Sequence, residues 1–158
     1  MLFSFMKILV FSDSHSYIDL MEAAIGQEKP DHVLHLGDYE RDYRQIRDKY
    51  PGIPMMNVAG NCDFGTDTPD TFLAKIAGIR IFMTHGHRYY VKSQYLRVVY
   101  AAQEENANVL LFGHTHRAEC FREKDMWVMN PGAAGRRGTY GIIEIDGESV
   151  SCRLASIN

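Results

Sequence analysis

Short apolar runs alternate with amphipathic segments up to about residue 112, and short apolar runs separated by turns fill the remainder of the chain. Runs of this kind, rich in branched residues and bounded by polar turns, predict buried strands. Strands are expected at residues 7–11, 33–36, 55–59, 72–76, 80–83, 108–112, 118–122, 127–130, 140–145 and 149–154. Those after residue 112 are expected to be antiparallel, because short turns such as Asp146-Gly147 separate them.

Apolar residues at helical spacing predict three helices between these strands. The first begins near Ile18 and ends at Lys29-Pro30, since the residue before proline is disfavoured in helical backbone. The second is expected at 41–50 and the third from about 91 to 105. Alternating strands and helices followed by a run of strands predict an α/β fold with a mixed sheet or two packed sheets. Without repeats or a linker, residues 1–158 are expected to form a single domain.

Composition narrows the class of protein. A chain of 158 residues with 46% hydrophobic and 23% charged residues is typical of an ordinary globular domain. The formal charge of −3 does not favour duplex nucleic acid as a partner. Three scattered cysteines without a CxxC pair indicate neither a disulfide framework nor a thiolate zinc site, so a cytoplasmic location is expected.

Targeting and membrane segments are not expected. The apolar start of the chain lacks a basic region and a cleavage site, so it is interpreted as the first strand, with residues 1–5 as a short extension. No stretch approaches the roughly 18 apolar residues of a membrane span.

Metal-ligating residue types follow five of the expected strands. They are Asp13 and His15, Asp38, Asn61, His85 and His87, and His114 and His116. In α/β sheets the site forms where loops leave the carboxyl ends of the strands, so these side chains are expected to converge.

This donor set is larger than one metal ion requires. Seven side chains form it: Asp13, His15, Asp38, Asn61, His85, His114 and His116. Oxygen and imidazole donors suit divalent manganese, iron, zinc, cobalt or nickel. The set would hold two ions if one carboxylate bridges them, and two such ions suit an in-line displacement at phosphorus.

The order of these motifs resembles the calcineurin-like metallophosphoesterases. The pattern here is Asp13-Ser14-His15, Gly37-Asp38, Gly60-Asn61, His85-Gly86 and Gly113-His114-Thr115-His116. The resemblance implies two packed mixed β-sheets flanked by helices. It also implies that Asp13, His15 and His116 hold one metal, that Asn61, His85 and His114 hold the other, and that Asp38 bridges the two.

The implied reaction is hydrolysis of a small phosphorylated substrate, preferably a phosphodiester, by in-line attack of a hydroxide that bridges the metals. Manganese is the preferred ion, with iron, zinc, cobalt, nickel and magnesium as alternatives. Asp38, Asn61 and His114 are the expected catalytic residues. Cys62 is interpreted either as a packing residue or as a substrate neighbour, and His87 either as a phosphate contact or as a surface histidine.

Gly60-Asn61-Cys62-Asp63 and Asn130-Pro131-Gly132 resemble the small prokaryotic YfcE-type phosphodiesterases. The chain departs from that branch at Ala133, where serine is common, and from the wider family at Cys62, where many members have histidine. A neutral thiol is a poorer proton donor than an imidazolium, so modest activity is expected, best with good leaving groups.

Other functions remain open at this point. One is a non-catalytic scaffold on the same fold, as in the retromer scaffold subunit, and another is a phosphomonoesterase or nucleotide polyphosphate hydrolase. A homo-oligomer is compatible with the sequence. His35 is interpreted as structural. Arg136-Arg137 is interpreted as a surface turn, with phosphate binding from a loop as the alternative.

Overall fold

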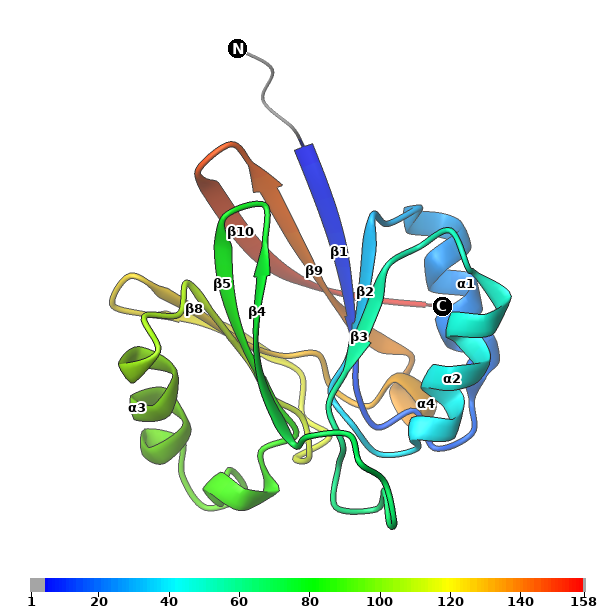
Figure 1. Cartoon of the computed structure of the whole chain (residues 1–158), viewed down its shortest axis with the longest axis horizontal. Coiled ribbons are helices and arrows are strands. Elements are labelled where there is room, and N and C mark those ends of the chain that lie inside the picture. Colours follow the sequence, from blue (N-terminus) through cyan, green and yellow to red (C-terminus); the bar gives the residue numbers. More distant parts are fainter. Residues whose placement is uncertain (1–4, 158) are drawn as a thin grey trace.

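The computed structural model describes residues 5–157 and contains two five-stranded β-sheets (Figure 1). In the first sheet the strand order is β10-β9-β1-β2-β3. Its strands are β1 (Phe5–Phe11), β2 (His32–His35), β3 (Met55–Asn57), β9 (Thr139–Asp146) and β10 (Ser149–Ser156). In the second sheet the order is β4-β5-β6-β8-β7. Its strands are β4 (Thr71–Ile76), β5 (Ile79–Thr84), β6 (Val109–Leu111), β7 (Glu119–Glu123) and β8 (Met126–Asn130).

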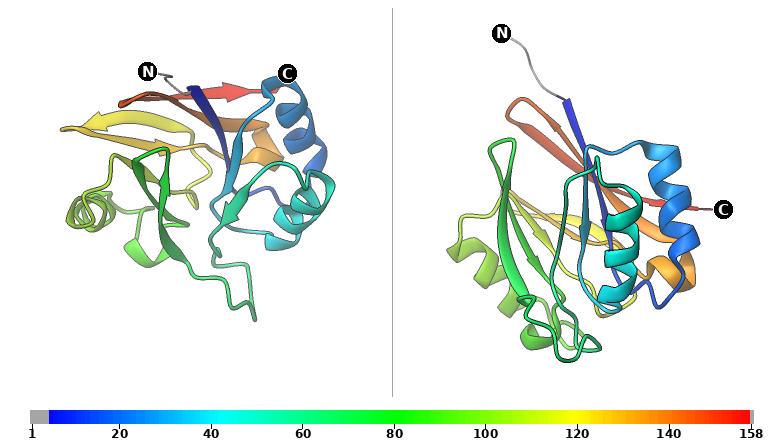
Figure 2. Two further views of the ribbon diagram at one scale, coloured as in Figure 1. Left: turned by 45° about the horizontal axis from the view of Figure 1, so that its top comes forward. Right: turned by 45° about the vertical axis from the view of Figure 1, so that its right-hand side comes forward.

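Helices and a 3₁₀ turn connect the strands of the two sheets. They are α1 (Ile18–Glu28), α2 (Glu40–Lys49), α3 (Leu96–Glu104), the one-turn α4 (Ala134–Arg137) and the 3₁₀ turn η1 (His87–Tyr89). Helices α1 and α2 flank the first sheet and α3 flanks the second (Figures 1 and 2). The expected fold, two packed mixed sheets flanked by helices, is therefore confirmed.

Alternating side chains on β1 explain why the sheet has two covered faces. Ile8 and Val10 pack between the sheets, against residues such as Ile81 of β5. Leu9 and Phe11 point the other way and pack under α1 and α2. Because successive side chains of a strand point to opposite faces, one continuous apolar run supplies both layers of the core.

Parallel pairing places the carboxyl ends of several strands at the same edge of each sheet. Strand β2 pairs in parallel with β1 and β3, and β6 pairs in parallel with β5 and β8. The loops that leave β1, β2, β3, β5 and β6 gather at the lower edge in Figure 1. Backbone hydrogen bonds join them, from Asp13 N–H to the Gly37 oxygen (3.0 Å) and from Gly113 N–H to the His85 oxygen (2.9 Å).

Two expectations need correction. The later strands are not all antiparallel, because β8 pairs in parallel with β6. Strand β7 lies at the edge of the sheet and pairs with the other side of β8, antiparallel to it. The third helix begins at Leu96 rather than near residue 91, because residues 90–93 form a separate turn in which the N–H groups of Ser93 and Gln94 both donate to the Tyr90 oxygen. Val91 is buried as part of the turn that packs over Gly86.

Smaller differences concern element ends and spans. Strand β3 ends at Asn57, and residues 134–137 form a helical turn where only a surface turn was expected. The extension expected at residues 1–5 lies outside the described residues except for Phe5, which begins β1. Within residues 5–157, no helix has the length and apolar character needed to cross a membrane.

Candidate metal centre

Unusual backbone conformations mark the loops at this edge. Asp13, His15, Asp38, His114 and His116 all have positive φ, between 47° and 71°. A residue with a Cβ in the left-handed region costs about 1–3 kcal/mol, and such strain concentrates at functional sites. These backbone conformations direct side chains from three short loops, those after β1, β2 and β6, into one region.

Glycines allow these loops to approach one another. A Cβ on Gly60 would lie 2.2 Å from Asp38 Oδ1, and a Cβ on Gly113 would lie 2.0 Å from Ser12 Oγ and 3.0 Å from Asp13 Oδ2. No real side chain tolerates such distances. Both positions therefore require glycine for close packing against the aspartate loops.

The two carboxylate oxygens of Asp13 have different surroundings. Oδ2 accepts hydrogen bonds from Ser12 Oγ (2.7 Å) and from the backbone N–H of His114 (3.1 Å). Oδ1 is buried and accepts none. It faces three imidazole Nε2 atoms, those of His116 at 3.2 Å and of His15 and His85 at 3.9 Å. A buried carboxylate oxygen without a donor is costly unless a cation meets it.

Asp38 presents a similar asymmetry. Its Oδ1 accepts the backbone N–H of Cys62 at 2.9 Å, and its Oδ2 lies 3.5 Å from His85 Nε2. Burial acts to raise the pKa of Asp38, but the imidazole of His85 and the hydrogen bond from Cys62 outweigh it, so the pKa lies below its usual value. The side chain is a carboxylate at neutral pH, with one oxygen directed at the other donors.

The orientation of His85 is fixed from the protein side. Its buried Nδ1 donates a hydrogen bond to the Leu36 carbonyl oxygen at 2.8 Å, which leaves the Nε2 lone pair facing Asp13 and Asp38. A carbonyl partner on the far nitrogen is the usual arrangement for a metal-binding histidine. His114 Nδ1 lies 3.2 Å from the same Nε2. Burial, with His85 and Lys92 nearby, lowers the pKa of His114 to about 4, so its ring is neutral at pH 7.

The structure brings most of the expected donors together. Two groups have ligand atoms within 4.8 Å of one another: one is Asp13, His15 and His116, and the other is Asp13, Asp38 and His85. His114 adjoins the second group through His85. The shared residue between these groups is Asp13, whereas the expected bridging residue was Asp38.

Asn61 differs from the other expected ligands. Its side chain is exposed, and its amide makes a hydrogen bond with Cys62 Sγ at 3.7 Å. Its loop nevertheless lies at the site, because Gly60 and Cys62 both contact Asp38.

Cys62 and His87 lie beside the donor set. Partial burial and then the negative charge of Asp38 raise the pKa of the Cys62 thiol, which therefore stays neutral at pH 7. The His87 ring centre lies 5.5 Å from that of His85 and 6.2 Å from that of His114. Its Nδ1 is buried without a hydrogen-bond partner, and burial, then His85, lower the pKa of its ring.

The family follows from comparison with known proteins. The family model for the calcineurin-like phosphoesterase superfamily domain matches residues 6–148. This chain belongs to that superfamily.

Individual relatives agree with this assignment. A probable metallophosphoesterase of Bacillus subtilis, YsnB, is 34% identical over 159 aligned positions, covering 94% of this chain and 90% of YsnB. A predicted phosphoesterase from Streptococcus pneumoniae has a similar crystal structure, with a TM-score of 0.81, 28% identity, and coverage of 97% of this chain and 90% of the other. Vacuolar Protein Sorting 29 from Cryptosporidium parvum shares the fold at 16% identity, with a TM-score of 0.75, covering 97% and 99% of the two chains.

Membership in the calcineurin-like phosphoesterases implies a divalent metal, and the donors fit one. The buried, unpartnered Asp13 Oδ1 and the orphaned, buried Nε2 of His15 are groups that a cation would satisfy. Oxygen and nitrogen donors without thiolates suit a divalent transition metal.

One positioning residue of this phosphoesterase domain was missed from the sequence. The Asp63 carboxylate accepts four backbone N–H groups: those of Asp38 (3.0 Å) and Gly60 (2.9 Å) on Oδ2, and those of Tyr39 (2.9 Å) and Glu40 (2.8 Å) on Oδ1. It therefore ties the Gly60 loop to the Asp38 loop and caps the start of α2 from outside the helix. An aspartate three residues after Gly60, in a turn, is the signal that could have identified it.

A buried chain of hydrogen bonds supports the Asp13–His15 loop. His35 Nδ1 accepts the Gly37 N–H (3.1 Å), so its Nε2 donates to Ser14 Oγ (3.0 Å), whose hydroxyl donates to Asp42 Oδ2 (2.8 Å). Asp42 Oδ2 also accepts the Ser16 N–H at 2.7 Å. Burial lowers the pKa of His35, in keeping with a neutral ring. The structural interpretation of His35 agrees with these contacts.

Proposed function

We propose that this protein is a phosphodiesterase that uses two divalent metal ions, preferably manganese. The observation that carries the proposal is the convergence of one free carboxylate oxygen each from Asp13 and Asp38 with imidazole nitrogens. When bound, two such ions neutralise phosphoryl oxygens and turn water into a strong nucleophile at neutral pH.

The proposed metal ligands are the seven residues Asp13, His15, Asp38, Asn61, His85, His114 and His116. The first site would use the group around Asp13, His15 and His116, and the second the group around Asp38 and His85 with His114. Asn61 would join the second site by turning its exposed amide away from Cys62.

Residues around the ligands have separate roles in the proposal. Neutral His87, with a free Nδ1, is placed to bind a phosphoryl oxygen. The neutral Cys62 thiol adds no negative charge beside the substrate, but it protonates a leaving group poorly. Esters with good leaving groups are therefore the expected best substrates.

Two hollows beside the site favour a diester over a monoester. One of about 250 Å³ is lined by His15, Tyr17, His116 and Arg136. Another of about 360 Å³ adjoins Cys62 and Tyr39. A phosphodiester has two ester groups, and each hollow would accommodate one of them.

Hydrolysis of bis-p-nitrophenyl phosphate by chelator-treated protein, with and without manganese, tests this function. We expect activity to return with the ion in the wild type and to fall at least 100-fold in Asp38→Asn. Asp48→Asn, an exposed site on α2, is the matched control. Uptake of two ions without release of nitrophenol would contradict the phosphodiesterase function, and monoester hydrolysis and scaffolding would be tested next.

A further inference from the structure

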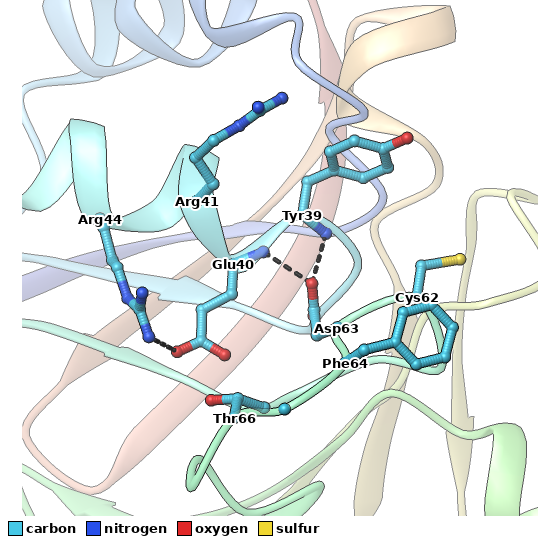
Figure 3. Close-up of a pocket in the computed structure, with 9 residues that line it drawn as sticks. Tyr39, Glu40, Arg41, Arg44, Cys62, Asp63, Phe64 and Thr66 are labelled. Carbon is cyan, nitrogen blue, oxygen red and sulfur yellow. Dashed lines mark hydrogen bonds and ion pairs between the residues drawn. The ribbon is translucent and has the colours of Figure 1, made fainter.

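The hollow of about 360 Å³ next to Cys62 is built from two segments, residues 39–44 and 62–66 (Figure 3). Asp63 holds the segments together through its hydrogen bonds to the backbone N–H groups of Tyr39 and Glu40. The hollow therefore has a fixed framework rather than a wall made of one flexible loop.

This hollow adjoins the candidate metal centre through two of its lining residues. The backbone N–H of Cys62 is bound to Asp38, and the Tyr39 ring meets the His15 ring edge-on with ring centres 4.7 Å apart. A phosphate at the centre would thus be able to place one ester group in the hollow.

One charged side chain of the hollow, the guanidinium of Arg41, is available to a ligand. Both oxygens of Asp63 are bound by backbone N–H groups, and Glu40 Oε1 accepts from Arg44 and Thr68, both at 2.8 Å. Arg41 donates to the neutral Ser16 hydroxyl at 2.8 Å. Among the ion pairs of residues 5–157, none includes Arg41, so its guanidinium can pair with an anionic group of a ligand.

Aromatic rings line the same hollow. Phe64 is 89% exposed and Tyr39 is 36% exposed. In Figure 3 these two rings lie on one side of the hollow, and Arg41 and Arg44 extend from α2 on the other. Exposed rings beside a guanidinium form a surface on which a flat, polar ring can stack.

We propose that this hollow binds an ester group that carries both a flat ring and a negative charge, which is the chemistry of a nucleotide. The proposal deepens the phosphodiesterase function and rests on it for the position of the reacting phosphate. Phe64 supplies stacking, Arg41 pairs with the additional negative charge, and Arg44 contributes the donors that Glu40 leaves free.

Calorimetric titration of metal-free protein with ADP, adenosine and pyrophosphate tests binding separately from catalysis. We expect Phe64→Ala to weaken ADP and adenosine about tenfold, within the range of one stacked base. Arg41→Gln should weaken ADP and pyrophosphate but not adenosine. Tyr100→Ala and Arg47→Gln, an exposed aromatic residue on α3 and an exposed arginine on α2, are the matched controls. Thermal unfolding midpoints would verify that all four variants are folded.

A pair of substrates with the same leaving group tests the hollow during hydrolysis. With manganese added, kcat/KM is compared for thymidine 5′-(p-nitrophenyl phosphate) and methyl p-nitrophenyl phosphate. We expect the ratio of thymidine to methyl ester to exceed ten and to fall about tenfold in Phe64→Ala.

The outcomes separate the two proposals. If both esters are hydrolysed but neither the ratio nor ADP binding changes in Phe64→Ala and Arg41→Gln, the nucleotide hollow is wrong and the phosphodiesterase function stands. If neither ester is hydrolysed while ADP binding depends on Phe64 and Arg41, the phosphodiesterase function is wrong and the hollow stands.

Discussion

The carboxylate of Asp63 accepts the backbone N–H of Asp38 at 3.0 Å, and it also binds three neighbouring N–H groups. Asp38 has left-handed backbone (φ 62°), which few residues adopt without support. The Asp63 side chain thus stabilises the conformation that directs Asp38 toward His85.

Replacing Asp63 with alanine should lower the free energy of unfolding by about 2–4 kcal/mol. Each hydrogen bond to a charged group contributes about 1.5–3 kcal/mol, and the total is reduced because the Asp63 carboxylate is partly exposed. Urea unfolding measures the change, and metal uptake should weaken with it. Asp67→Ala, exposed on the same loop, should change stability by less than about 0.5 kcal/mol. Equal effects of the two variants would refute the positioning role.

Gly60→Ala should impair the metal centre, because the new Cβ would lie 2.2 Å from Asp38 Oδ1 and would displace that carboxylate. We expect metal affinity to fall about 10–100-fold, as when a metal ligand loses its support. Gly26→Ala is the matched control, since nothing lies within 4 Å of its Cβ. Inside α1 it should stabilise the protein by about 0.5–1 kcal/mol. Unchanged metal affinity in Gly60→Ala would contradict the claim that the metal centre depends on the close approach of Gly60 to Asp38.

Ser14→Ala should destabilise the protein by about 1–3 kcal/mol. The change leaves the buried His35 Nε2 without its acceptor and removes one donor to Asp42. Chemical unfolding measures the loss, with the exposed Ser93→Ala as the control. A loss as small as that of the control would mean that water replaces the hydroxyl.

The metal-free protein should lose stability as the pH falls from about 6.5 to about 4. In this window the unfolded chain protonates His114 at its usual pKa, while the folded chain, with a His114 pKa of about 4, does not. The unfolded state binds more protons there, so acid favours unfolding. His35 and His87, whose pKa values are also lowered, add to the effect.

Unfolding midpoints across this pH range measure the slope, and His114→Asn should make it shallower. Asp38 contributes at lower pH, because its pKa lies below the usual value for aspartate. A slope that is the same in wild type and His114→Asn would show that the folded protein accepts a proton at this ring.

The central strands were predictable from the sequence because the apolar runs of β1, β5 and β6 are buried on both faces, as Ile8 and Leu9 illustrate. The start of α3 was not, because Val91 is buried at a position that also fits a helical stripe. Only the structure shows that Val91 belongs to the turn at residues 90–93, which lies before α3. The parallel pairing of β6 and β8 likewise depends on a neighbour far along the chain.

The sequence by itself determined the family, the order of the strands and of the helices α1, α2 and α3, and which residue types follow each strand. Tertiary structure decided how the donors are shared. Asp13 rather than Asp38 is common to both clustered groups, and the Asn61 amide faces Cys62. It also assigned Asp63 its role, since its four N–H partners come from two loops. Motif spacing fixes chemistry along the chain, whereas the direction of each side chain depends on contacts between loops that are distant in sequence.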